Sequence, residues 1–161
     1  YGGANLAWQE SQRGHVVAQS LNFDVDPRIG VLAFVPSTEL STSKARKMLP
    51  ESIPHSEAVR NSSNVAVLVQ ALQHRPDLLL GATEDYLHQA YRKDAMPNSF
   101  ALMTKLRKAG VAAFISGAGP TVLVLHTGGE TEAAELERAA GDKFHMISLG
   151  ISRAGVSVIT A

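Results

Sequence analysis

The sequence predicts an α+β domain, in which helices stack on one face of a mostly antiparallel sheet. The first observation behind this prediction is the order of strand, helices, strand, turn, strand, helix and strands along the chain. The second is its size and composition: 161 residues, of which 45% are hydrophobic, are enough to bury the core of one globular domain. Neither a repeat nor a low-complexity linker divides the chain.

The strand predictions rest on short apolar runs that turn signals separate. Residues 4–8 and 15–21 are expected to form a β-ribbon, with a turn at Gly14 between them. Residues 29–35 form a continuous apolar run that a proline ends, which is typical of a strand at the centre of a sheet. The remaining predicted strands are 111–115, 122–125, 144–149 and 155–159.

The first two helix predictions lie between the central strand and residue 73. A short basic helix is expected over 42–49. A longer helix is expected over 56–73, because apolar and small residues recur there at helical spacing. The stripe that we expect to face the core consists of Val59, Ser62, Val65, Ala66, Val69 and Leu72.

Three further helices are predicted from the residues that begin and end helices. Prolines are tolerated in a first helical turn, so one helix is expected from Pro76 to Arg92 and the next from Pro97 to a C-terminal cap at Gly110. A last helix is expected from an N-cap at Thr131 to Ala140. The inward positions expected of the helix from Pro76 are Leu79, Leu80, Thr83, Tyr86, Leu87 and Ala90.

The composition excludes several classes of function. Fifteen basic and fifteen acidic residues cancel and are scattered, so no long-range field favours nucleic acid or an anionic membrane as a partner. The chain has no cysteine, and its six histidines lack the close spacing of a zinc site. No apolar run approaches the ~20 residues that span a bilayer. We therefore expect a cytoplasmic protein that has no metal site of its own and whose partners are small molecules or protein.

A two-glycine turn lies between two apolar runs, at Ser116-Gly117-Ala118-Gly119. Glycine adopts positive φ without a steric penalty, and it leaves neighbouring N–H groups open to an anion. The pattern favours a turn that handles phosphate. A plain β-hairpin loop is the alternative that the same spacing leaves open.

Two arginines are candidate ligands for a carboxylate. Thr42 and Arg46 are four residues apart at the start of a predicted helix, so a hydroxyl and a guanidinium share one helix face there. Arg92 is a second candidate clamp, because a guanidinium binds a carboxylate through two parallel hydrogen bonds. The alternatives left open are an N-cap followed by a solvated basic face, and a basic helix end that complements the helix dipole.

Two adjacent acidic residues, Glu84 and Asp85, lie within the helix predicted from Pro76. Side chains one residue apart diverge on a helix. We therefore interpret the pair as part of a solvent-exposed face and not as a catalytic dyad.

With these stretches in order, the chain resembles the homoserine kinases of the GHMP family of small-molecule kinases over essentially its whole length. The motifs that carry the resemblance are Ser41-Thr42-Ser43-Lys44-Ala45-Arg46 with Leu49-Pro50, Tyr91-Arg92 with Pro97, the turn from Ser116 to Thr121, and the opening Tyr1-Gly2-Gly3 with Leu6-Ala7-Trp8. The chain departs from the family pattern at Asn98, where many relatives have glycine, and at Ala118, where the turn has serine.

The resemblance implies a C-terminal GHMP kinase domain, a ferredoxin-like antiparallel sheet with helices on one face. Residues 29–161 would form this domain, and residues 1–28 would be strands that follow an N-terminal domain. The chain starts at Tyr1 without a methionine. We therefore expect a piece of a longer protein that lacks the N-terminal ATP-binding domain.

By the same resemblance, the full enzyme transfers the γ-phosphoryl group of ATP, with Mg²⁺, to the hydroxyl of L-homoserine in threonine biosynthesis. The substrate-binding residues would be Thr42, Arg46, Arg92, Gly117 and Gly119. Support for the phosphate loop of the other domain would come from Ser116, Gly117, Ala118 and Gly119. ATP and Mg²⁺ would be bound mainly by the missing domain, so this chain alone is expected to be inactive.

Two alternatives stay open at the level of the sequence. Another small-molecule kinase of the same family would share the glycine turn, but it would have no need of two arginines that bind a carboxylate. A non-catalytic regulatory module would use the same arginines to bind an amino acid. The sequence assigns no catalytic base, and it leaves open whether the protein forms a homodimer.

Overall fold

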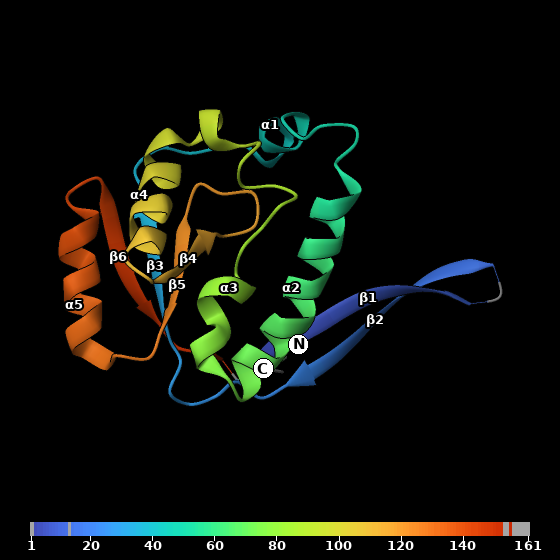
Figure 1. The fold of residues 1–161 in the computed structure, drawn as a ribbon, viewed down its shortest axis with the longest axis horizontal. Helices are drawn as coiled ribbons and strands as arrows, with labels where there is room; N and C mark the ends of the chain where they lie inside the picture. Colours follow the sequence, from blue (N-terminus) through green and yellow to red (C-terminus); the bar gives the residue numbers. More distant parts are fainter. Residues whose placement is uncertain (1, 13, 153–154, 156–161) are drawn as a thin grey trace, which may run out of the picture.

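The structure, a computed structural model, describes residues 2–12, 14–152 and 155. Its arrangement is shown in Figure 1. The strands are β1 (Ala4–Gln12), β2 (His15–Phe23), β3 (Gly30–Pro36), β4 (Ala112–Ile115), β5 (Val122–His126) and β6 (Phe144–Leu149). The α-helices are α1 (Thr42–Lys47), α2 (His55–Gln73), α3 (Leu79–Ala82), α4 (Pro97–Lys108) and α5 (Gly129–Ala140), and the 3₁₀ turns are η1 (Pro76–Leu78) and η2 (Lys93–Ala95).

A four-stranded antiparallel sheet with the order β4-β5-β3-β6 forms the centre of the domain. The apolar strand β3 is central, as predicted: Phe34 pairs with Val122 on β5 and with Met146 on β6. Strands and helices follow one another in the order β-α-β-β-α-β of a ferredoxin-like fold. The predicted α+β class is therefore confirmed.

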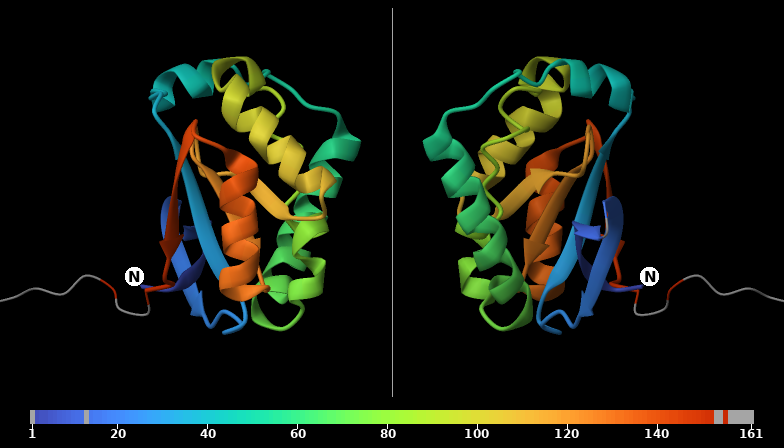
Figure 2. Two further views of the ribbon diagram at one scale, coloured as in Figure 1. Left: turned by 90° about the vertical axis from the view of Figure 1, so that its left-hand side faces the viewer. Right: turned by 90° about the vertical axis from the view of Figure 1, so that its right-hand side faces the viewer.

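One face of this sheet is covered by α4 and α5 (Figure 2). Side chains alternate between the two faces of a strand, so Leu32 and Phe34 of β3 both point to this covered face, and both are fully buried. The main core also contains Val122, Val124, Leu102, Met103, Leu106 and Leu136. The helix predicted from Pro97 is confirmed, and Gly110 adopts φ +85° just after it.

The predicted core stripe of α2 is wrong in its first half. Val59 and Val65 are 51% and 48% exposed, whereas Ala71 near the end of the helix is fully buried. The helix packs against α3 and η1 only through its C-terminal half, in a second core cluster with Ile29 and Ala112. Five residues of the helix between positions 61 and 72 line a cavity.

The helix predicted from Pro76 to Arg92 ends ten residues early, at Ala82. Side chains compete there for the groups that would continue the helix. The Thr83 hydroxyl donates to the Leu79 carbonyl at 2.8 Å, and the Arg107 guanidinium donates to the Leu80 carbonyl at 2.6 Å. Residues 83–92 instead form an irregular loop, and Ala90, predicted to face inward, is exposed.

The remaining predictions differ from the structure in detail. Strands β1 and β2 form the predicted ribbon, which extends away from the body of the domain (Figure 1). Helix α5 begins at Gly129, and Thr131 is not its N-cap, because the Glu132 carboxylate accepts a hydrogen bond from the Gly128 N–H at 2.7 Å. The strand predicted over 155–159 lies outside the described residues, apart from residue 155.

Candidate functional site

A cavity of about 690 Å³ lies between α2, the loop of residues 83–92 and the turn that joins β4 to β5. Helix α1 contributes Thr42 and Arg46 to the lining of this cavity. Of the residues predicted to bind substrate or to support the phosphate loop, five line this cavity: Thr42, Arg46, Arg92, Gly117 and Ala118. Ser116 and Gly119 are not among the lining residues, although they belong to the same turn.

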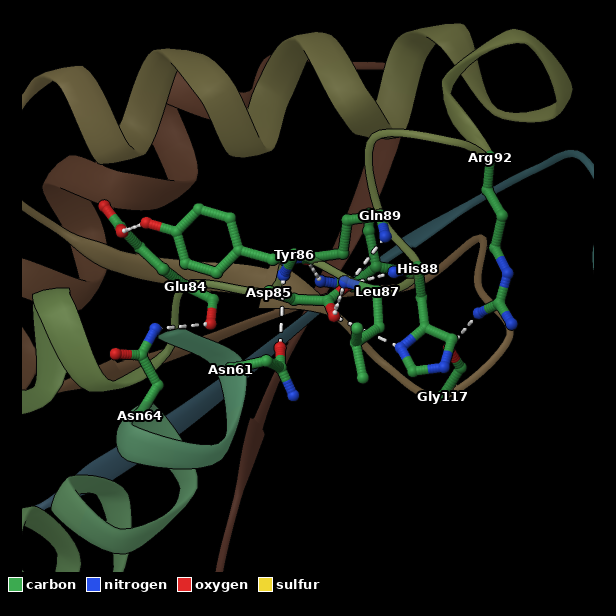
Figure 3. A network of polar contacts seen from close by, with 11 residues as sticks. Asn61, Asn64, Glu84, Asp85, Tyr86, Leu87, His88, Gln89, Arg92 and Gly117 are labelled. Carbon is green, nitrogen blue, oxygen red and sulfur yellow. Dashed lines mark hydrogen bonds and ion pairs between the residues drawn. The ribbon is translucent and has the colours of Figure 1, made fainter. Parts of the chain in front are cut away.

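Arg92 is the most constrained charged group of the cavity, with only 7% of its surface exposed. Its Nη1 donates to the carbonyl oxygen of Gly117 at 3.0 Å (Figure 3). Its Nε is buried and has no hydrogen-bond partner among the described residues. A buried guanidinium keeps its charge, and a buried donor without a partner is costly. Arg92 lines the cavity, and its guanidinium has donors left for a further acceptor, such as the oxygens of a carboxylate.

The second arginine, Arg46, is exposed on α1. The hydroxyl that caps this helix is Ser41 Oγ, which accepts from the Lys44 N–H at 3.2 Å. Thr42 is therefore not the N-cap, and it lines the cavity together with Arg46. The two residues share one helix face, as their spacing predicts.

The glycine turn is the loop of a β-hairpin between β4 and β5. Gly117 and Gly119 adopt φ +54° and +85°, and the peptide bond between Gly119 and Pro120 is cis. The Gly119 N–H donates to the Ser116 carbonyl at 2.8 Å, so this N–H is used within the turn. The turn contributes to the cavity mainly through the Gly117 carbonyl, which holds Arg92.

The interpretation of Asp85 as part of a solvated helix face is wrong. Its side chain is 21% exposed, and its carboxylate accepts hydrogen bonds from three backbone N–H groups, of Leu87, His88 and Gln89, at 2.6–3.0 Å. The carboxylate also lies 3.1 Å from Nδ1 of His88. Aspartate commonly binds the N–H groups that follow it in a turn, and this is the signal that the sequence offered. Glu84, in contrast, is exposed as predicted.

Gln89 was missed from the sequence, because a single glutamine carries no pattern. Its side chain is buried, and Oε1 accepts from the Ile115 N–H at 2.6 Å. Strand β4 is at the edge of the sheet, so the outward N–H of Ile115 has no strand partner. Gln89 therefore supplies the acceptor that this edge lacks.

Two asparagines of α2 hold the opposite side of the same loop (Figure 3). Asn61 Oδ1 accepts from the Tyr86 N–H at 3.2 Å, and Asn64 Nδ2 donates to the Glu84 carbonyl at 3.0 Å. The Tyr86 hydroxyl donates to the Glu84 carboxylate at 2.6 Å, a hydrogen bond that raises the pKa of Tyr86. The loop that carries Arg92 is thus fixed from both sides of the cavity.

Within the described ranges, no group of three or more histidine, aspartate or glutamate side chains is placed to hold a metal ion. The N–H of the second turn glycine, Gly119, already has a partner in the turn. Searched over the same part of the chain, no helix has the length and apolar character needed to cross a membrane.

Comparison with known proteins identifies relatives over nearly the whole chain. The family model for the C-terminal domain of GHMP kinases matches residues 66–145. The homoserine kinase of Streptomyces avermitilis is 43% identical over 158 residues, which are 98% of this chain and 50% of that protein. The homoserine kinase of Rhodococcus erythropolis is 43% identical over 163 residues, with 99% and 51% covered. The chain therefore spans about half the length of these curated relatives.

Solved structures share the fold. The crystal structure of homoserine kinase from Cytophaga hutchinsonii superposes with a TM-score of 0.72 at 21% identity, over 84% of this chain and 46% of that one. A structure from Listeria monocytogenes superposes with a TM-score of 0.57 at 23% identity, over 96% and 51%. The chain therefore belongs to the GHMP kinase family, and its fold is that of the family's C-terminal domain.

Proposed function

We propose that the chain is the substrate-side half of a homoserine kinase, an enzyme that transfers the γ-phosphoryl group of ATP to the hydroxyl of L-homoserine. The curated relatives named homoserine kinase support this proposal, since they match 98–99% of the chain. The single observation that carries it is the buried guanidinium of Arg92, which lines a cavity together with Arg46 and whose Nε has no partner within the described ranges. This arrangement suits a small substrate that has a carboxylate.

In this proposal the substrate carboxylate lies against the guanidinium of Arg92, and Arg46 adds a second positive charge from α1. Thr42 contributes a hydroxyl on the same side of the cavity. Gly117 holds Arg92 in place through its carbonyl oxygen. Phosphoryl transfer depends on positioning and on stabilisation of charge more than on covalent help from the protein, so a carboxylate clamp contributes directly to the rate.

We assign ATP and Mg²⁺ mainly to the half of the relatives that this chain does not match. The turn of Ser116, Gly117, Ala118 and Gly119 would brace the phosphate-binding loop from that half, and Gly119 would contact substrate only after the two halves come together. Residues 1–28, which include the β1–β2 ribbon, would form the junction. The proposal includes a cytoplasmic location and threonine biosynthesis as the pathway.

The experiment compares the 161-residue chain with the complete product of the gene that encodes it. ADP release is measured with ATP, Mg²⁺ and L-homoserine, and in parallel with mevalonate and galactose as acceptors. We expect activity with L-homoserine in the complete product and none in the chain alone. Preference of the complete product for another acceptor would contradict the proposal, as would turnover at ordinary rates by the chain alone.

Calorimetry distinguishes the kinase from a regulatory module that binds an amino acid. L-Homoserine and L-threonine are titrated into both proteins, with and without a non-hydrolysable ATP analogue. A kinase binds L-homoserine in the complete product and more tightly when the nucleotide is present. Tight binding of L-threonine by the chain alone, with no effect of the nucleotide, would support the regulatory module instead.

A further inference from the structure

The loop that carries Arg92 is rigid because its own side chains replace regular backbone hydrogen bonds. The Asp85 carboxylate accepts hydrogen bonds from the N–H groups of Leu87, His88 and Gln89, and these bonds form one turn. The Arg92 N–H in turn donates to the carbonyls of His88 and Gln89, at 3.2 and 3.3 Å. Arg92 therefore follows directly on a turn whose shape is set by one carboxylate.

Two hydrogen bonds fasten this loop to the β4–β5 hairpin, and both use side chains of the loop. Figure 3 shows the bond from Arg92 to Gly117. Gln89 reaches the N–H of Ile115, the last residue of β4, and Arg92 reaches the carbonyl of Gly117 two residues further on. These bonds hold the end of the loop nearest to Arg92, whereas Asn61 and Asn64 hold its beginning at Glu84 and Tyr86. Two bonds at successive points of the hairpin fix both the position and the orientation of the loop.

The Arg92 bond to Gly117 cannot provide this alignment alone. Arg92 is the group that we expect to bind substrate, and a long side chain held at one point retains freedom along the rest of its length. Gln89 is 8% exposed and lines the same cavity, and its Oε1 is bonded at 2.6 Å. It therefore offers a short, buried and uncharged link between the loop and the sheet.

We propose that Gln89 is a positioning residue for substrate recognition: by accepting from the Ile115 N–H, it holds the loop of residues 83–92 against β4 and so keeps Arg92 at the wall of the cavity. This role rests on the proposed function, because it needs a substrate carboxylate for Arg92 to receive. Gln89 itself does not contact the reacting atoms. Loss of its bond is expected to weaken substrate binding without impairing the nucleotide site.

The test replaces Gln89 in the complete gene product with methionine, which has a similar length and no acceptor oxygen, and with glutamate, which keeps an oxygen for the Ile115 N–H. Gln70→Met on the exposed side of α2 is the matched control. For Gln89→Met we expect the KM for L-homoserine to rise between about 10-fold and about 100-fold, since small misplacements of a positioning group have effects of this size. The KM for ATP should stay near that of Gln70→Met, whereas the urea unfolding midpoint should fall below it, because the buried Ile115 N–H loses its acceptor.

Amide hydrogen exchange provides the readout that does not depend on turnover. In Gln89→Met the Ile115 amide should exchange faster, and Gln89→Glu should restore both its protection and much of the KM. A wild-type protein that does not phosphorylate L-homoserine overturns the proposed function, and this role of Gln89 with it. A wild-type protein that is active, together with an unchanged KM for L-homoserine in Gln89→Met, overturns the role of Gln89 alone. A KM for ATP that rises in Gln89→Met as much as the KM for L-homoserine would show a merely structural residue and would also overturn it.

Discussion

The guanidinium of Arg92 donates from Nη1 to the carbonyl oxygen of Gly117 at 3.0 Å, and this bond joins two segments that are 25 residues apart in the chain. It uses one nitrogen of a guanidinium that lines the cavity, and Nε has no partner within the described ranges. The same carbonyl belongs to a glycine with positive φ, so the backbone of the turn is shaped to present it.

Arg92→Lys keeps the positive charge and removes the planar fork. A lysine cannot bond to the Gly117 carbonyl and to both oxygens of a carboxylate in the same geometry. We expect the KM of the complete gene product for L-homoserine to rise about 10- to 100-fold, which corresponds to the loss of a charged hydrogen bond of about 1.5–3 kcal/mol. Steady-state kinetics measure this effect, and Arg138→Lys at an exposed position of α5 is the control. An unchanged KM in Arg92→Lys would contradict the role of the fork.

Gly119→Ala should destabilise the protein more than Gly117→Ala. Both residues have positive φ, which costs an alanine about 1–2 kcal/mol. A Cβ on Gly119 would also lie 2.7 Å from Cε of the buried Met96 and 3.0 Å from Cγ2 of Ile115, whereas a Cβ on Gly117 meets no atom within 4 Å. Urea unfolding of the two variants should show the larger loss for Gly119→Ala. Equal decreases in stability for the two variants would contradict this prediction, because they would mean that Met96 and Ile115 move away from the added Cβ at no cost.

Arg107→Met should destabilise the loop that follows α3. The Arg107 guanidinium donates to the Thr83 hydroxyl and the Ala113 carbonyl, each at 3.0 Å, and to the Leu80 carbonyl at 2.6 Å. Removal of the donor leaves half-buried acceptors without a partner, at an expected cost of about 1–3 kcal/mol. Denaturant unfolding measures this loss in the free energy of unfolding. Lys108→Met on the exposed side of α4 is the control. An effect no larger than that of Lys108→Met would show that water replaces these bonds.

The stability of the segment before β3 should depend on pH in the acid range. Hydrogen bonds from the side chain and the backbone of Arg28 lower the pKa of Asp26 from 3.8 to about 2. Because the folded state favours the ionised carboxylate, its contribution to stability is complete above about pH 4 and is lost as the pH falls through about 2.

The variant Asp26→Asn tests this dependence. Its urea unfolding midpoint should lie below that of the wild type at pH 6, and the difference should disappear near pH 2. Asp142→Asn, which removes an exposed carboxylate, is the control for the loss of one charge. A difference between Asp26→Asn and the wild type that stays constant from pH 6 to pH 2 would contradict the lowered pKa.

Periodicity and turn chemistry predicted most of the fold. The apolar run of β3, the ribbon of β1 and β2, and the proline and glycine that bound α4 lie where the sequence places them. The predictions fail where a side chain from elsewhere in the fold competes with the local pattern. The helix from Pro76 stops because Arg107, 27 residues beyond Leu80, takes the Leu80 carbonyl.

The residues of the candidate site likewise fall into two groups: those that the sequence predicted and those that it did not. Thr42, Arg46, Arg92 and Gly117 were found from motifs, and the structure brings all four to one cavity. Asp85, Gln89 and the two asparagines of α2 were missed, because their partners are backbone groups that only the folded chain brings close to them. Local sequence holds no pattern for such contacts.

The most direct measurement titrates L-homoserine and L-homoserine amide, which lacks the carboxylate, into the complete gene product by calorimetry, with wild-type protein and Arg92→Gln in parallel. The amide should bind the wild type at least about 10-fold more weakly, since a charged hydrogen bond contributes about 1.5–3 kcal/mol. In Arg92→Gln the preference for L-homoserine over the amide should become much smaller, and only the contribution of Arg46 to carboxylate binding should remain. Equal binding of L-homoserine and its amide by the wild type would contradict the role of Arg92 as the carboxylate clamp.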